Sequence, residues 1–273
     1  MKQSFSVLMS VYKNDDPLFF KQALESVINQ TTMPSEIVLM VDGPVSDELD
    51  NVIRESQKRY SLLKVVRFEQ NQGLGKALHE GVKHATHDII ARMDSDDIAA
   101  PDRFEKQLVC FSSDSDLSIV GGTISEFIDS SDNIVGHRVC PLTNEDIREY
   151  MKTRCGFNHM TVMFRKSEVL RVGNYLDWFW NEDYYLWIRM MLAGCKFANL
   201  SDTLVNVRVG KDMYARRGGW SYFKSEAGIQ RYMWKHKLIS FPKYLYNLTI
   251  RFVLQVAMPN SLRGWVFRTF ARK

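Results

Sequence analysis

Short apolar runs alternate along the first hundred residues with segments that have the apolar spacing of amphipathic helices. The apolar runs are rich in Val, Ile, Leu and Met, so they predict buried strands. These strands are expected at residues 5–12, 36–41, 62–68 and 88–93. The segments between them, at 16–31, 46–60 and 74–86, predict helices. The alternation therefore predicts an α/β fold with a mostly parallel sheet, which binds ligands at the carboxyl ends of its strands.

Beyond residue 100 the alternation is less regular. Two β-like stretches, at 118–128 and 134–139, flank a polar turn and predict a hairpin. The other predicted elements are helices at 101–111, 144–153 and 182–193 and strands at 161–164 and 197–208. Gly194 follows the last of these helices, at a position where glycine commonly ends a helix.

The pattern predicts one α/β domain followed by a helical extension. The domain covers residues 1–219, with a first half over about 1–100 and a second half over about 101–219. Residues 220–273 are mainly helical, basic and aromatic, with breaks at Pro242 and Pro259. The 273 residues are 45% hydrophobic and 25% charged, which is typical of a globular chain and excludes a disordered or coiled-coil protein. No uncharged apolar run reaches the roughly 18 residues that a membrane-spanning helix needs.

Positive charge is concentrated in the last quarter of the chain. Residues 205–273 contain 14 Lys and Arg but only two acidic residues, whereas the whole chain has a net charge of +4. This asymmetry predicts a polyanionic partner, which is either nucleic acid or an anionic membrane surface. No recognisable nucleic-acid-binding motif accompanies the charge, so we expect no nucleic acid partner.

The segment 240–273 has the character of an interfacial helix. Within it, Asn247, Arg251 and Gln255 form a narrow polar stripe beside a wide apolar face. After Pro259, Trp and Phe are interleaved with Arg and Lys, which suits the surface of an anionic membrane. The alternative is that these helices pack on the core of the protein or on a second subunit.

Three carboxylates within four residues follow the predicted strand 88–93. In the sequence Asp94-Ser95-Asp96-Asp97 these groups repel one another, so a divalent cation or strong hydrogen bonds would stabilise them. Mg²⁺ and Mn²⁺ suit one or two carboxylates together with phosphate oxygens of a substrate. The alternative is an acidic loop that caps the next helix, but the position at a strand end favours a ligand site.

Other polar residues lie close to predicted strand ends or helix starts. Asp42 ends the second strand, and the loop 71–76 offers flexible backbone and Lys76 to a nucleotide or phosphate. The spacing of this loop matches neither a dinucleotide-binding motif nor a P-loop. Glu182 and Asp183 open a helix, where acidic residues commonly have a purely structural role because they complement the helix dipole. The same dipole keeps a carboxylate ionised, which a general base needs.

Two further candidates carry positive charge or a ring nitrogen. His159 precedes a predicted strand, where it is either a structural histidine or a ligand. A basic cluster lies beside several glycines and is either a solvated charged face or a segment suited to neutralising a diphosphate leaving group. Its members are Arg208, Lys211, Arg216 and Arg217.

Taken together, the motifs resemble those of glycosyltransferase family 2, and specifically those of bacterial polysaccharide and O-antigen transferases. The motifs are SVLMSVY, VDG, NQGLGKAL, ARMDSDD, NHMTVMFRKS, NEDYYLWIRMMLAG and VRVGKDMYARRGG, in this order over residues 4–220. The resemblance implies a GT-A fold, a nucleotide-sugar donor, a Mn²⁺ or Mg²⁺ ion and inversion at the anomeric carbon.

The resemblance also implies roles for individual residues on the donor side. Ser10 and Tyr12 would border the nucleoside, and Asp42 would hydrogen-bond the base, typically uracil. Asp94 would lie against the ribose and the metal, and Asp96 would be the main ligand of the ion. The remaining residues predicted to contact the nucleotide sugar are Gly73, Lys76, Arg92 and Ser95.

On the acceptor side, Asp183 would deprotonate the acceptor hydroxyl, with Glu182 beside it in the E-D motif. His159 is a tentative further metal ligand, and the basic cluster would hold the diphosphate or the acceptor. The sequence departs from the family pattern where Val41 replaces an aspartate that many members have before Asp42. It also lacks the Q-x-x-R-W motif of processive synthases, which favours transfer of one sugar per acceptor.

The resemblance predicts a peripheral enzyme at the cytoplasmic face of the bacterial inner membrane. It would add one hexose, glucose or galactose from its UDP form, in a β linkage to GlcNAc or GalNAc on undecaprenyl diphosphate. One alternative is a nucleotidyltransferase, but residues 13–17 do not form the glycine-rich phosphate loop expected after its first strand. Another alternative is a non-catalytic sugar-binding assembly subunit, against which the presence of both acidic motifs argues.

Overall fold

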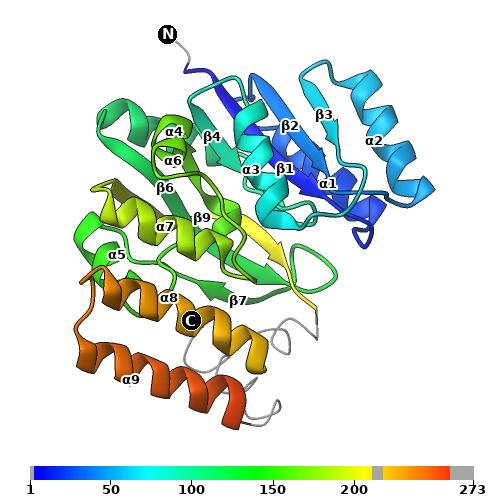
Figure 1. Ribbon diagram of the computed structural model, residues 1–273. Coiled ribbons are helices and arrows are strands. Elements are labelled where there is room, and N and C mark those ends of the chain that lie inside the picture. The colour runs from blue at the N-terminus through cyan, green and yellow to red at the C-terminus, as the bar shows by residue number, and fades with distance from the viewer. Residues whose placement is uncertain (1–2, 211–217, 259–273) are drawn as a thin grey trace.

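Four parallel strands form the first half of the sheet, as the alternating pattern predicts (Figure 1). The computed structural model describes residues 3–210 and 218–258. Strands β1 (Phe5–Val11), β2 (Glu36–Val41), β3 (Leu63–Arg67) and β4 (Ile89–Arg92) pair in the order β3-β2-β1-β4. Val11 pairs with Val41, so the chain leaves β1 and β2 at the same edge of the sheet. The residues that follow these strands are therefore brought together.

A second group of strands continues the same sheet. Strand β8 (Met163–Arg165) is antiparallel to both β4 and β6 (Leu117–Phe127), and β6 pairs in parallel with β9 (Lys196–Arg208). The predicted hairpin is confirmed, because β7 (Ile134–Arg138) lies antiparallel to β6. The short β5 (Ile98–Ala99) pairs with β9. Both predicted halves of the domain thus contribute to one curled sheet, which has nine strands within the described residues.

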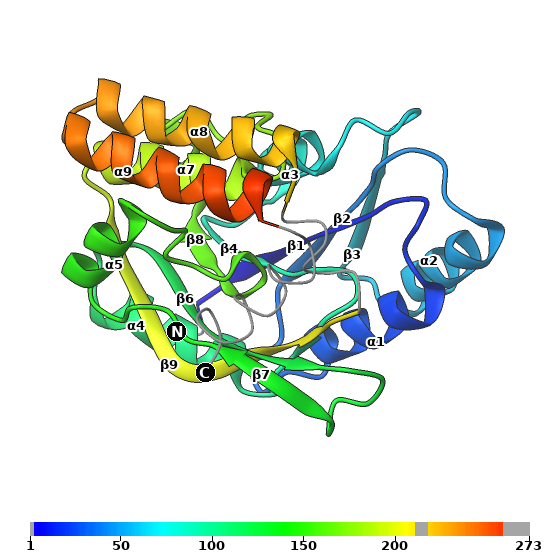
Figure 2. The ribbon, with the colours of Figure 1, turned by 90° about the horizontal axis from the view of Figure 1, so that it is seen from below.

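Helices cover both faces of the sheet (Figure 2). One face carries α1 (Pro17–Ile28), α2 (Asp47–Arg59) and α4 (Arg103–Ser113), whose apolar residues join one core cluster. The other face carries α3 (Leu74–His84), α5 (Asn144–Met151) and α7 (Glu182–Leu192), which join a second cluster. Two short helical segments, η1 (His159–Thr161) and α6 (Lys166–Arg171), flank β8. The sheet is buried from both sides, which explains why its strands read as continuous apolar runs.

The C-terminal extension begins with a helical hairpin, which lies at the bottom of Figure 1. Helix α8 (Trp220–Lys235) buries Ile229 and Met233 in the same cluster as α7. Helix α9 (Phe241–Phe252) packs on α8 and continues into the π-helical turn η3 (Val253–Ala257). The predicted break at Pro242 is confirmed as the first turn of α9. Pro259 and the basic segment after it lie outside the described residues.

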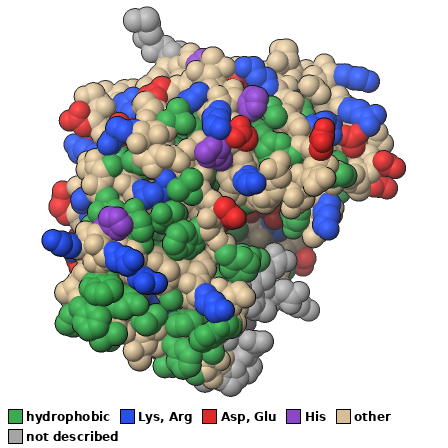
Figure 3. Space-filling view, viewed as in Figure 1, with side chains coloured by type: hydrophobic (Ala, Val, Ile, Leu, Met, Phe, Trp, Pro, Cys, Tyr) green, Lys and Arg blue, Asp and Glu red, His purple; other side chains and the backbone are tan. Residues whose placement is uncertain are grey.

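The polar stripe of α9 faces the protein interior. Asn247 donates to the side chain of Gln230 over 2.7 Å, and Arg251 and Gln255 both contact the Glu226 carboxylate, at 2.7 and 2.8 Å. All three stripe residues are less than 9% exposed. The wide apolar face of α9 therefore points to the solvent, where Figure 3 shows apolar side chains gathered over the helical hairpin. Within the described residues, no helix has the length and apolarity needed to cross a membrane.

Candidate active site

The acidic turn 94–97 follows β4 at the carboxyl edge of the parallel strands. Asp97 is only 2% exposed, and its Oδ1 accepts a hydrogen bond of 2.9 Å from the backbone N–H of Arg208. Its Oδ2 is buried and has no hydrogen-bond partner among the described residues. Burial, followed by the charges of Asp94 and Asp96, raises the pKa of Asp97 well above its usual value.

A fourth carboxylate that the motifs did not identify joins this turn. Asp15 accepts hydrogen bonds from the Ser95 hydroxyl, at 2.8 Å, and from the backbone N–H of Tyr12, at 3.1 Å. Desolvation raises the pKa of Asp15 to about 6 and also raises that of Asp96 to about 6, although Asp96 is exposed as a residue. Asp15 follows the first predicted strand, so its position at the sheet edge is a signal that could have revealed it.

The acidic turn fits a hard divalent cation. Its carboxylates are desolvated and repel one another, so positive charge brought among them would be strongly favourable. No group of three His, Cys, Asp or Glu side chains within 3–210 and 218–258 is arranged to enclose a metal by itself. This arrangement suits an ion such as Mg²⁺ or Mn²⁺ that takes one or two carboxylates and completes its coordination with phosphate oxygens and water.

Asp42 organises the loop between β3 and α3. Its carboxylate accepts hydrogen bonds from the side chain of Asn71, at 2.9 Å, and from the backbone N–H groups of Gln72, at 2.7 Å, and Gly73, at 2.9 Å. Gly73 has a φ of 90°, a conformation that favours glycine, and it starts α3. The structure thus gives Asp42 a role in shaping the loop 71–76, and its predicted contact with a base stays a prediction.

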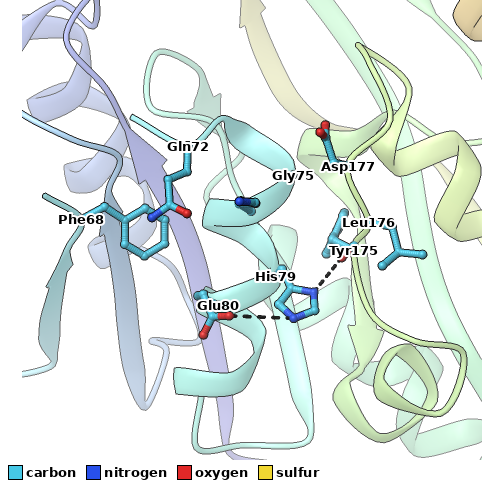
Figure 4. A pocket seen from close by; sticks show the side chains of 9 residues that line it. Phe68, Gln72, Gly75, His79, Glu80, Tyr175, Leu176 and Asp177 are labelled. Atoms are coloured by element: carbon cyan, nitrogen blue, oxygen red, sulfur yellow. Dashed lines mark hydrogen bonds and ion pairs between the residues drawn. The ribbon is translucent and has the colours of Figure 1, made fainter. Parts of the chain in front are cut away.

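A hollow of about 470 Å³ lies beside the first turns of α3 (Figure 4). Gln72 and Lys76 line it from the loop 71–76, and Leu176 and Asp177 line it from the segment before α7. The His79 ring is fixed by a 2.7 Å hydrogen bond between Nδ1 and the backbone carbonyl of Tyr175. The predicted residues Ser10 and Tyr12 lie at the end of β1, where Ser10 is half-buried and Tyr12 is 40% exposed.

Arg92 connects the two acidic groups of the candidate site. Its side chain is almost fully buried, and its Nη2 lies 2.5 Å from Asp94 Oδ1. Its Nε and Nη1 atoms are buried without a hydrogen-bond partner in the described part of the chain. The charge of Arg92 also lowers the pKa values of Glu182 and Asp183, which are otherwise raised. The structure therefore places Arg92 inside the site, beneath the acidic turn.

Glu182 and Asp183 open α7, as the sequence predicts. Burial, followed by the charge of Asp183, raises the pKa of Glu182 to about 7. Burial also raises the pKa of Asp183, whose Oδ1 accepts a 2.6 Å hydrogen bond from the backbone N–H of Tyr184. A carboxylate with a raised pKa is a stronger base than one in water, so Asp183 is suited to accept a proton.

Two neighbours of Asp183 were not found from the sequence. The Cys155 thiol lies 3.9 Å from Asp183 Oδ2, and Arg138 in β7 lowers the pKa of Asp183 through its charge. Arg138 is held by a 2.9 Å hydrogen bond from its Nη2 to the backbone carbonyl of Cys155. Neither residue belongs to a motif, because the fold brings Arg138 to α7 from β7 and Cys155 from the segment between α5 and η1.

His159 and Arg208 have well-defined packing roles. His159 Nε2 lies 3.0 Å from the Tyr175 hydroxyl, and burial lowers the pKa of the histidine well below its usual value. The structure matches the structural alternative for His159, and metal binding stays a prediction. The Arg208 guanidinium lies 3.8 Å from the centre of the Phe19 ring and donates to the backbone carbonyl of Asp96 over 3.2 Å. The predicted Lys211, Arg216 and Arg217 lie outside the described residues.

The curled α/β sheet has an acidic turn at its carboxyl edge and a carboxylate of raised pKa at the start of α7. This is the architecture of a GT-A glycosyltransferase. The family model for glycosyl transferase family 2 matches residues 6–172, and the chain belongs to this family. It is therefore a glycosyltransferase, and the expected fold class is confirmed. The nucleotidyltransferase and non-catalytic alternatives are set aside.

Two curated relatives and one solved structure illustrate the similarity. The chain is 42% identical over 227 residues to the amylovoran biosynthesis glycosyltransferase AmsE of Erwinia amylovora, which covers 83% of this chain and 84% of that protein. It is 37% identical over 270 residues to a UDP-Gal:alpha-D-GlcNAc-diphosphoundecaprenol beta-1,3-galactosyltransferase of Escherichia coli, over 98% and 97% of the two chains. The mannosyltransferase PcManGT of Pyrobaculum calidifontis, solved with GDP-Man and Mn²⁺, has a TM-score of 0.64 at 15% identity and covers 99% of this chain and 76% of that one.

Proposed function

We propose that this chain transfers one hexose, glucose or galactose, from its UDP derivative to GlcNAc or GalNAc carried on undecaprenyl diphosphate, with inversion at the anomeric carbon. The observation that carries the proposal is the pair of acidic groups that share Arg92, one suited to a cation and one to a proton. The 37% identity to a transferase named for UDP-Gal and a diphosphoundecaprenol acceptor supports the choice of substrates.

On the donor side, Asp96 and Asp94 would hold a Mn²⁺ or Mg²⁺ ion against the diphosphate of the nucleotide sugar. When bound, such an ion supplies positive charge to the leaving diphosphate. Arg92 holds Asp94 in place from below, and Arg208 supports the backbone of the turn at Asp96. The loop 71–76, shaped by Asp42, would contact the nucleotide sugar through Gly73 and Lys76.

On the acceptor side, Asp183 accepts the proton of the acceptor hydroxyl while that oxygen bonds to C1 of the donor sugar. The bond between C1 and the diphosphate oxygen breaks in the same displacement, so the configuration at C1 inverts. The desolvated surroundings of Asp183 raise its pKa and make this proton transfer more favourable.

The test is a transfer assay with Mn²⁺, a panel of UDP-sugars and a synthetic GlcNAc-diphosphate-lipid acceptor. We expect a product heavier than the acceptor by one hexose, with the large anomeric coupling constant of a β linkage. An α-linked product would exclude the single displacement, and the absence of product with every donor would exclude the proposed substrates.

We further propose that the outer face of α9 binds the cytoplasmic face of the bacterial inner membrane. The exposed apolar residues of α9 and the first residue of η3 are Phe241, Leu245, Tyr246, Ile250, Phe252 and Val253. Exposed basic residues lie close by in sequence, with Lys235 at the end of α8 and Lys237 just after it. Apolar side chains next to cationic ones suit an anionic bilayer surface, where the lipid-linked acceptor resides. The boundary of this membrane-associating unit at residue 220 stays a prediction.

Vesicle sedimentation tests this surface. Replacement of Leu245, Ile250 and Phe252 by Gln should reduce binding to phosphatidylglycerol vesicles several-fold, because the apolar area that enters the bilayer is lost. Thr249→Gln is the matched control, because Thr249 is exposed on the same helix and is already polar. Equal binding of the triple variant and the control would place the membrane contact elsewhere.

A further inference from the structure

A strained turn presents two aromatic side chains immediately before the catalytic pair. The backbone N–H of Asn181 donates to the carbonyl of Trp178 over 3.0 Å, which closes a four-residue turn with Phe179 and Trp180 at its centre. Trp180 occupies the third position with a φ of 59°. This position of a type II turn normally holds glycine or asparagine, and a bulky residue there is strained.

Both central side chains are unusually open to solvent. Phe179 and Trp180 are each 53% exposed, and their ring centres are 6.0 Å apart. Neither ring is needed to fill the core, so the folded state gains little from placing a tryptophan at a strained position. Strain that persists in this way is commonly found at functional sites.

Helix α8 fixes the turn from behind. The Ser225 hydroxyl donates to the carbonyl of Phe179 over 2.5 Å and accepts from the side chain of Asn181 over 3.0 Å. The indole N–H of Trp178 donates to the Ser225 carbonyl over 3.1 Å. Gly228 allows this approach, because a Cβ there would come within 2.8 Å of the Trp178 ring. The turn is thus held in one geometry while its two outer rings stay free.

The turn lies where the loop 71–76 and the start of α3 meet the start of α7. Asn181 ends it, and Glu182 and Asp183 follow directly. Gly75 lies in the first turn of α3, and a Cβ there would lie 3.6 Å from the Cβ of Glu182 and 3.7 Å from the Cα of Asp177. The residues on either side of the aromatic turn therefore pack against the first turn of α3, next to the pocket that Gln72, Leu176 and Asp177 line (Figure 4).

We infer that Phe179 and Trp180 form an acceptor subsite, in which an aromatic ring packs against the C–H face of the acceptor sugar. This inference rests on the proposed function and adds a contact that selects and orients the acceptor. A pyranose ring has an apolar face and hydroxyl groups around its edge, so an exposed aromatic ring binds it without fixing which hydroxyl reacts. The subsite would hold the sugar while its hydroxyl reaches Asp183.

The geometry favours a sugar over the membrane as the occupant. Insertion into a bilayer requires exposed apolar area but no particular ring orientation, as on the outer face of α9. The turn instead has a strained tryptophan and three side-chain hydrogen bonds through Ser225 and its neighbours. Such a fixed arrangement is expected where a ring must meet a ligand at a defined position beside a reacting group.

The test compares Trp180→Gly with Trp180→Phe and the control Trp220→Ala. Trp220 is a suitable control because it is 52% exposed but lies at the start of α8. For Trp180→Gly we expect the KM for a short-chain, water-soluble GlcNAc-diphosphate acceptor to rise roughly tenfold, with the donor KM unchanged. Its Tm should stay the same or rise, because glycine relieves the positive φ. Trp180→Phe should keep part of the acceptor affinity that Trp180→Gly loses.

Each outcome separates the possibilities. An unchanged acceptor KM in Trp180→Gly would overturn the inference. A loss of activity that appears only with acceptor embedded in vesicles, and that Trp220→Ala shares, would also overturn it, because it indicates contact with lipid. Saturation-transfer NMR with the same soluble acceptor gives a readout that does not need turnover. If the native protein makes no product but shows contacts to the sugar that Trp180→Gly loses, the subsite stands and the proposed reaction fails.

Discussion

Two groups of acidic residues are both stabilised by the charge of buried Arg92 but differ in how their own charge is balanced. In the turn 94–97 the carboxylates crowd one another and Asp15, and one buried oxygen of Asp97 has no partner in the described structure. At the start of α7, Asp183 receives a backbone hydrogen bond and is near Arg138 as well as Arg92. The first group would gain from an additional cation, whereas in the second the charges of Arg92 and Arg138 offset part of the raised pKa of Asp183.

This difference separates two chemical tasks. Crowded carboxylates gain most from a divalent ion, which neutralises several of them at once. A desolvated carboxylate whose charge is partly balanced by nearby arginines gains most from one proton. In the proposed function the same residue type would therefore serve metal binding in one place and base catalysis in the other because the neighbours differ.

The largest effect is expected from Asp96→Ala. Loss of the main predicted ligand should abolish Mn²⁺-dependent binding of UDP in calorimetry and bring transfer below detection. Removing one of several repelling carboxylates should leave the Tm of the metal-free protein unchanged or higher. Asp102→Ala is a matched control, because this aspartate, whose side chain is 44% exposed, lies outside the turn and pairs with Lys106. Full Mn²⁺-dependent binding in Asp96→Ala would show that the turn is not the cation site.

The next effect in size is expected from Asp183→Asn. Replacing the base by an isosteric amide should lower kcat by about 10²–10⁴-fold, while donor binding stays intact. The contrast with Asp96→Ala is the decisive feature, because the two variants should fail at different steps. Titration calorimetry with UDP and Mn²⁺ measures the first step, and a single-turnover assay measures the second. Normal turnover in Asp183→Asn would remove this residue as the base.

The fold and the acidic motifs could be predicted because they depend on local patterns. The parallel half of the sheet follows from alternating periodicity, and the turn 94–97 and the pair at 182–183 are contiguous in sequence. The confirmed break at Pro242 has the same origin, since proline restricts the backbone wherever it occurs.

The parts that could not be predicted depend on contacts between distant residues. Arg138 and Cys155 reach Asp183 only through the hairpin and the segment before β8. The aromatic turn is held by hydrogen bonds to Ser225, which lies more than 40 residues later in the chain. The sequence also could not predict that the polar stripe on α9 faces the protein interior, because periodicity defines a face of the helix but not what that face contacts.

A smaller effect is expected from pH. Burial raises the pKa of Asp183 above its usual value of 3.8, and the base must be ionised to accept a proton. With saturating substrates, kcat should therefore fall about tenfold per unit as the pH drops below this raised pKa. Glu182→Gln identifies the titrating group, since the pKa of Glu182 is about 7. If the acid limb disappears in Glu182→Gln, then Glu182 rather than Asp183 controls the rate.

The smallest and most discriminating effect is expected from Arg92→Met compared with Arg138→Met. Both arginines lower the pKa of Asp183, so either change should move the acid limb of kcat to higher pH. Only Arg92 also lowers the pKa values of Asp96 and Asp97, so only Arg92→Met should change the pH dependence of Mn²⁺ binding. Arg92→Met should also cost about 2 kcal/mol of stability, less than a fully buried pair, because Asp94 is 30% exposed. If both variants leave Mn²⁺ binding unchanged, the two acidic groups are electrostatically independent, and Arg92 does not link them.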